Sequence, residues 1–86
     1  MARIEVYTTQ FCPYCVRAKR LLQERGLAYE EFDVGDDDRL RDEVIERSGG
    51  RRTVPQIFIA GRAIGGYDEL AALDASGDLA TLTQDG

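Results

Sequence analysis

The chain has 86 residues, of which 43% are apolar and 31% charged, and its formal net charge at pH 7 is −5. This length suits one domain over residues 1–86, and its longest apolar run is far too short to cross a bilayer, so we expect no membrane partner. The negative charge argues against a nucleic-acid partner, because phosphate binding needs a basic face.

The first predicted element is a strand at residues 3–8. Apolar and polar side chains alternate there and several are β-branched, which is typical of a strand. Because the pattern starts almost at the N-terminus, with no basic and then apolar segment before it, we expect no secretory signal. The default compartment is then the cytoplasm, where thiols are kept reduced.

Two cysteines, Cys12 and Cys15, stand where the strand pattern gives way to a helical one. Cys12 takes the N-cap position and Pro13 the first helical position, where the missing proline N–H leaves no hydrogen bond unmade. Free amides and the positive end of the helix dipole then face the Cys12 sulfur and favour its thiolate. With added help from cations such as Arg17 or Lys19, we expect a strongly lowered pKa for Cys12. Cys15 is expected to be better shielded, with a normal or raised pKa.

A strand and a helix are predicted next. The strand covers residues 28–34, and its charged side chains suggest a position near a sheet edge. Acidic residues at 36–38 supply N-cap candidates for the helix, which Ser48-Gly49-Gly50 ends.

The last part of the chain reads as a β-hairpin followed by helices. Gly61-Arg62 fits a two-residue hairpin turn with glycine first. The residues from 83 to 86 are expected to fray. The predicted elements are strands at 56–59 and 63–65, a helix at 67–75 and a short helix at 78–82.

The resulting order, β-α-β-α-β-β-α with a short extra helix, predicts an α/β fold. The first crossover must be parallel and right-handed, and the later strands form an antiparallel hairpin. Helices can therefore flank both faces of a four-stranded mixed sheet.

The pair of cysteines allows several chemistries. A structural zinc site within one chain lacks ligands, because the sequence has two cysteines and no histidine. A passive disulfide is disfavoured by the compartment and by the very small loop that it would close. A zinc or iron–sulfur site between two chains stays open, with external thiols as further ligands. Catalytic redox use is the favoured interpretation.

Three motifs together resemble the signatures of dithiol glutaredoxins of the bacterial type. They are Cys12-Pro13-Tyr14-Cys15, Thr53-Val54-Pro55 and Gly65-Gly66-Tyr67-Asp68, and nearly the whole chain follows the family pattern. The resemblance implies a thioredoxin fold and a monomer that uses glutathione as reductant. Its substrates would be glutathionylated or disulfide-bonded proteins, with Cys12 as the nucleophile and Cys15 as the resolving thiol.

The resemblance also changes the prediction for Pro55. Base rates alone predict a trans peptide bond, with the proline merely starting a strand. In thioredoxin-like folds this proline is cis beside the attacking sulfur. The Val54 N–H and C=O are then free to pair with an extended substrate as an added strand.

A glutathione-binding site is implied as well. The paired glycines let the backbone approach a ligand closely, and the helix N-terminus offers amides to a carboxylate. Asp68 would accept the α-ammonium of the γ-glutamyl group, although taken alone it is equally an N-cap, as Tyr14 is equally a helix-face residue. The implied binding residues are Tyr14, Arg52, Thr53, Val54, Pro55, Gly66, Tyr67 and Asp68.

The chain departs from the family at Thr9, where a lysine that meets the glycine carboxylate of glutathione commonly stands. Arg51 and Arg52 are the candidates to replace it, and the sequence does not choose between them. Two alternative functions remain: a glutathione-assisted iron–sulfur dimer, and a thioredoxin-like electron donor served by a flavoprotein reductase. The main interpretation needs no metal.

Overall fold

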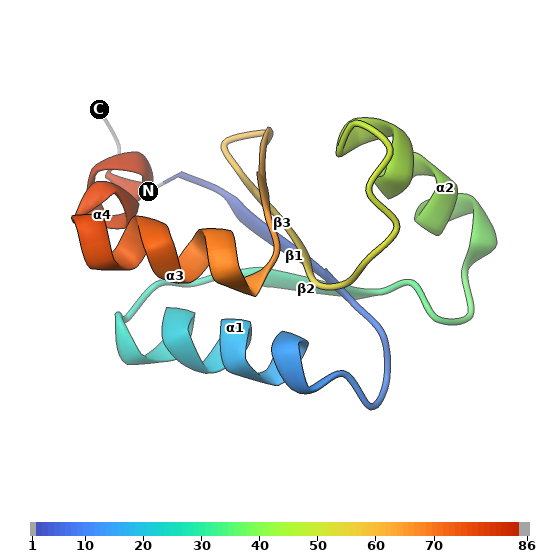
Figure 1. Cartoon of the computed structure of the whole chain (residues 1–86), viewed down its shortest axis with the longest axis horizontal. Helices are drawn as coiled ribbons and strands as arrows, with labels where there is room; N and C mark the ends of the chain where they lie inside the picture. Colours follow the sequence, from blue (N-terminus) through green and yellow to red (C-terminus); the bar gives the residue numbers. More distant parts are fainter. Residues whose placement is uncertain (1, 85–86) are drawn as a thin grey trace.

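Each predicted strand and helix has a counterpart in the computed structural model, which describes residues 2–84 (Figure 1). The predicted order is confirmed, including the short helix at the end. The elements are β1 (Ile4–Thr8), α1 (Pro13–Glu24), β2 (Glu30–Asp33), α2 (Asp38–Arg47), β3 (Gln56–Ile59), β4 (Arg62–Gly65), α3 (Tyr67–Ser76) and α4 (Asp78–Thr83).

The strands form one mixed sheet in the order β2-β1-β3-β4. β1 runs parallel to β2 and antiparallel to β3, and β3 pairs antiparallel with β4. The charged strand β2 is therefore an edge strand, as its sequence predicted. None of the helices among residues 2–84 combines the length and the apolar character needed to cross a membrane.

β1 and β3 are buried on both faces, so the sheet separates two apolar clusters. On one face Ile4 and Val6 pack with α1, α3 and α4, and on the other Tyr7 and Phe58 pack with Val44 of α2. Alternate side chains of a strand point to opposite faces, which explains why neighbours in β1 belong to different clusters. Figure 1 shows α1 and α2 on opposite sides of the sheet.

A buried polar side chain, Glu5, lies beside the apolar cluster that contains Val44 of α2. Glu5 is only 5% exposed, and its carboxylate accepts hydrogen bonds from Tyr7 Oη at 2.5 Å and Arg47 Nη1 at 3.4 Å. The Arg47 guanidinium also lies 4.2 Å from the centre of the Phe58 ring. A buried carboxylate is tolerated when it is paired in this way, and the contacts fasten the end of α2 to the sheet.

The hairpin turn differs from the prediction. Ile59 pairs with Arg62, so the turn residues are Ala60 and Gly61, with φ angles of 53° and 79°. Two positive φ angles are the mark of a type I′ turn, whose twist matches that of the strands. The predicted turn at Gly61-Arg62 was therefore wrong by one residue, and β4 starts at Arg62.

The predicted fraying is wrong at Thr83, which is 4% exposed at the end of α4. Its Oγ1 donates to Leu79 O at 2.8 Å, and its carbonyl accepts from the Ala2 N–H at 3.2 Å. These bonds hold the end of the helix against the start of the chain. Gln84 is exposed, and its N–H donates to Ala80 O at 3.1 Å, while residues 85–86 fall outside the described residues.

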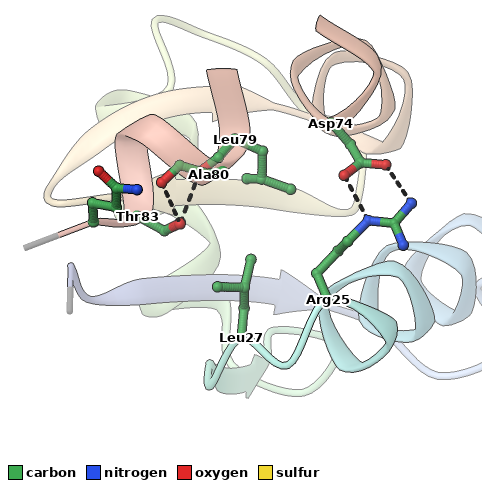
Figure 2. A pocket seen from close by; sticks show the side chains of 7 residues that line it. Arg25, Leu27, Asp74, Leu79, Ala80 and Thr83 are labelled. Carbon is green, nitrogen blue, oxygen red and sulfur yellow. Dashed lines mark hydrogen bonds and ion pairs between the residues drawn. The ribbon is translucent and has the colours of Figure 1, made fainter. Parts of the chain in front are cut away.

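A hollow of about 510 Å³, which neither cysteine lines, lies where α4 and the end of α3 meet the end of α1 (Figure 2). Arg25 and Asp74 form a two-point ion pair at its edge, with Nε–Oδ1 at 2.7 Å and Nη2–Oδ2 at 2.8 Å. Such a parallel pair has good geometry, and it ties the end of α1 to α3.

Candidate active site

Cys12 and Cys15 are joined by a disulfide at the start of α1. Cys12 is the N-cap and Pro13 the first helical residue, as predicted, and the Cys15 N–H donates to the Cys12 sulfur at 3.1 Å. Cys12 is half-buried whereas Cys15 is only 2% exposed, so the predicted shielding of Cys15 is confirmed. The helix thus presents one sulfur to the surface and encloses the other.

The nearby cations have other partners. The Arg17 guanidinium lies 5.4 Å from the centre of the Tyr14 ring, and Lys19 Nζ lies 3.0 Å from Glu31 Oε2. Glu31 balances the charge of Lys19, and the contact that the structure gives the Cys12 sulfur at the helix N-terminus is the Cys15 N–H. The lowered pKa of Cys12 stays a prediction.

The loop before β3 brings Val54 and Pro55 beside the first sulfur. The Val54–Pro55 peptide bond is cis, as the family resemblance predicted, and Val54 O lies 3.8 Å from Cys12 Sγ. The buried side chain of Gln56 donates to Thr53 O at 2.8 Å and to Thr53 Oγ1 at 3.2 Å, which fixes the loop. The sequence does not reveal this support, because Gln56 has the pattern of an ordinary strand residue.

A shallow groove of about 320 Å³ gathers most of the predicted binding residues. They come from α1, from the loop before β3 and from the start of α3, and the rings of Tyr14 and Tyr67 have centres 6.4 Å apart. Arg52 is exposed and does not line this groove, whereas Arg51 does. The predicted residues that line the groove are Tyr14, Thr53, Val54, Pro55, Gly66, Tyr67 and Asp68.

The sequence left open that Asp68 is the N-cap of α3, and the structure rules this out. Gly66, not Asp68, is the N-cap, so Asp68 lies inside the first turn with an exposed side chain. The carboxylate of Glu69 accepts the Gly66 N–H at 2.9 Å and so takes the capping role. Glu69 was not among the predicted site residues, although a glutamate three residues after an N-cap is a known signal.

Glu69 also pairs with Arg51, with Oε1 and Nη1 2.7 Å apart. The hydrogen bond from the Gly66 N–H, and then the one from Arg51, hold the pKa of Glu69 below its ordinary value of 4.5. Glu69 is therefore a charged carboxylate at neutral pH, within the groove.

Gly65 is shaped by this ion pair. Its φ is +122°, and a Cβ atom there would overlap the Glu69 carboxylate and lie 2.6 Å from Arg51 Nη1. The positive φ favours glycine, and a Cβ atom would also have to push aside the flexible ends of Glu69 and Arg51. The close approach that the structure shows at Gly65 is to the Arg51–Glu69 pair, and the approach of a ligand to Gly65-Gly66 stays a prediction.

Three exposed apolar side chains lie within four residues of Cys12 in the chain. Phe11 is 98% exposed with a φ of 58°, and Tyr14 and Val16 are about half exposed. Sequence analysis did not single out Phe11, because a lone aromatic residue usually points into the core. Phe11 and Val16 line the same hollow as Cys12, and Tyr14 lines the groove with Val54 and Pro55.

No three cysteine, aspartate or glutamate side chains within residues 2–84 are grouped as metal ligands.

Comparison with known proteins gives a consistent result. The family model for glutaredoxin matches residues 4–64. Glutaredoxin 3 of Escherichia coli K12 is 52% identical over 79 residues, which cover 92% of this chain and 94% of that protein. The glutaredoxin of Pseudomonas aeruginosa PAO1 is 44% identical over 82 residues, 95% of this chain and 96% of that one.

Solved structures agree with the sequence matches. The solution structure of a Brucella melitensis glutaredoxin has a TM-score of 0.85 and 46% identity, and covers 96% of this chain and 89% of that one. A crystal structure of a buckwheat glutaredoxin–glutathione complex has a TM-score of 0.87 and 28% identity, and covers 95% of this chain and 76% of that one.

Proposed function

Since this chain belongs to the glutaredoxin family and is a thiol–disulfide oxidoreductase with a thioredoxin fold, we propose that it uses glutathione to reduce protein–glutathione mixed disulfides and protein disulfides. The observation that carries the proposal is the groove beside Cys12, which gathers nearly all the residues that the family resemblance implies for glutathione. The related buckwheat protein crystallised as a glutathione complex, which supports the same choice of thiol.

With a glutathionylated protein, the cycle begins at the Cys12 thiolate. It attacks the glutathionyl sulfur, the mixed disulfide breaks, and the protein sulfur leaves as a thiolate while Cys12 becomes glutathionylated. The thiolate of a second glutathione then attacks the glutathionyl sulfur on Cys12. Glutathione disulfide leaves, and the Cys12 thiolate is restored.

With a protein disulfide, Cys15 is also needed. Cys12 attacks first and forms a mixed disulfide with the substrate, and deprotonated Cys15 then attacks the Cys12 sulfur and releases the reduced protein. The disulfide between Cys12 and Cys15 is the product of that step. Two glutathione molecules reopen it and leave as glutathione disulfide.

We assign binding roles to the groove as follows. Val54, beside the first sulfur, pairs its backbone with the extended ligand, and the first amides of α3 receive a ligand carboxylate. The exposed carboxylate of Asp68 receives the α-ammonium group, and the ring of Tyr14 covers the ligand. The protein acts as a monomer in this scheme, and a cytoplasmic setting fits it because thiols are kept reduced there.

A comparison of electron donors tests the function. The purified protein should reduce a glutathionylated peptide when supplied with glutathione, glutathione reductase and NADPH, followed by loss of NADPH absorbance. A thioredoxin reductase system should not support turnover. Turnover with thioredoxin reductase alone would instead identify a thioredoxin-like electron donor.

A further inference from the structure

The Arg51–Glu69 ion pair lies inside the groove and not on a remote surface. Both residues line the same hollow as Tyr14, Val54 and Tyr67. Glu69 Oε1 is held from two sides, by Arg51 Nη1 at 2.7 Å and by the Gly66 N–H at 2.9 Å. A carboxylate of the protein itself is therefore seated on a cation and a helix N-terminal amide.

These two donors are the groups that a carboxylate ligand needs. A guanidinium and the free amides at a helix N-terminus are the usual partners of a bound carboxylate. Glutathione carries two carboxylates, one on glycine and one on the γ-glutamyl group. While Glu69 holds Arg51 and Gly66, an incoming carboxylate meets a negative charge and donors that are already engaged.

We propose that Glu69 is an internal competitor, a carboxylate that occupies an anion subsite of the groove and must release Arg51 before a carboxylate of the thiol ligand can bind there. The inference rests on the proposed use of glutathione and adds a determinant of affinity to it. It also selects Arg51, not Arg52, as the cation that replaces the lysine absent at Thr9.

The exposure of the pair sets the size of the effect. The side chains of Arg51 and Glu69 are 44% and 40% exposed, and an ion pair this exposed contributes little stability. Release of Arg51 is therefore easy, and removal of the charge at position 69 should tighten binding about two- to fivefold. The gain should shrink as salt is added, because salt screens exposed charges.

The test measures binding without chemistry. S-methylglutathione has no free thiol, so its Kd can be measured by titration calorimetry on the full chain. Glu69→Gln removes the charge but keeps an oxygen for the Gly66 N–H, since glutamine also serves in capping boxes. We expect its Kd to be about two- to fivefold lower than that of the wild type. Glu46→Gln, which removes an exposed charge on α2, is the matched control and should leave the Kd unchanged.

A double-mutant cycle separates competition from a general charge effect. In an Arg51→Met background, Glu69→Gln should bring no comparable gain, because the cation to be released is absent. Repeating the cycle with the glycyl ethyl ester of S-methylglutathione identifies the carboxylate involved. Loss of the gain assigns the glycine carboxylate to Arg51. A retained gain assigns the γ-glutamyl carboxylate instead and overturns the replacement of the lysine by Arg51.

A second measurement needs no variant and guards against a poorly folded Glu69→Gln. In the wild type, the ¹³C NMR titration of the Glu69 carboxyl carbon should show a higher pKa when S-methylglutathione is bound, because Arg51 has been taken away. An unchanged titration, or a folded Glu69→Gln with equal or weaker binding, would overturn the competitor role alone. Absence of binding by wild type and variants alike would overturn the glutathione assignment itself.

Discussion

Two thiols three residues apart have different surroundings. Cys12 is a half-buried N-cap whose sulfur accepts the Cys15 N–H, whereas Cys15 is enclosed beneath it. A sulfur that must meet a bulky substrate has to be the outer one. The inner sulfur reaches only its neighbour, which suits an intramolecular step.

Serine substitutions test this division. Cys12→Ser should abolish reduction of both mixed and protein disulfides, because no nucleophile remains, and serine preserves the helix cap. Cys15→Ser should keep most of the activity on a glutathionylated peptide and lose the activity on a protein disulfide. Steady-state assays with both substrates measure the difference. Equal losses in the two variants would refute the assigned roles.

Phe11 offers a test of how protein substrates are recognised. Its exposed ring lies next to Cys12, so we expect Phe11→Asn to lower kcat/KM for a protein disulfide roughly fivefold, through lost apolar contact. Asparagine tolerates the left-handed backbone found there, which keeps the loop intact. A small mixed disulfide should react at the wild-type rate. Gln10→Asn in the same loop is the control, and an equal drop in both variants would show a loop effect instead.

At the scale of the elements, the start of α3 depends on Gly65. We expect Gly65→Ala to lower the free energy of unfolding by roughly 1–3 kcal/mol, because a side chain at a φ of +122° strains the backbone, and to displace the flexible ends of Glu69 and Arg51. Urea unfolding followed by circular dichroism measures the loss. Gly26→Ala is the control for a glycine at an ordinary left-handed φ, +68°, where nothing lies within 4 Å of the Cβ position. A loss at Gly65 no larger than that of Gly26→Ala would show that its φ of +122° and its neighbours add no strain.

The elements themselves follow from local sequence, and the contacts between them do not. The N-cap at Cys12 and the edge position of β2 could be predicted because caps and charged edges depend on neighbouring residues. The pairing of Arg51 with Glu69 joins two segments far apart in the chain, which no local pattern reveals. The hairpin turn was placed one residue late, because Ala60 adopts a positive φ that sequence rules reserve mainly for glycine.

At the scale of the whole molecule, buried charge makes stability depend on pH. Burial acts to raise the pKa of Glu5, but the hydrogen bonds from Tyr7 and Arg47 outweigh it and leave that pKa below its ordinary 4.5. The pKa of Glu69 is lowered as well. A carboxyl whose pKa is lower in the folded state stabilises the fold above its unfolded pKa, and that stability is lost as the pH falls through the folded value.

We therefore expect the free energy of unfolding to be steady near neutral pH and to fall as the pH drops below about 4.5. Urea titrations at a series of pH values measure this. Glu5→Gln should be less stable at neutral pH, because the charged partner of Arg47 is lost, and its stability should fall less steeply in acid. If the free energy of unfolding fell equally steeply with decreasing pH in the wild type and in Glu5→Gln, the titration of Glu5 would not contribute to the loss.

The hydrogen bond between Ala2 and Thr83 has a practical corollary. It brings the two ends of the described chain together, and Figure 1 places both at the opposite side of the molecule from the start of α1. A fluorescent reporter, an affinity tag or a surface tether attached at either end would therefore point away from the sulfurs. The same geometry allows a short linker to join the ends and new termini to be opened in the Ala60–Gly61 turn, which would give a circular permutant with an undisturbed redox centre.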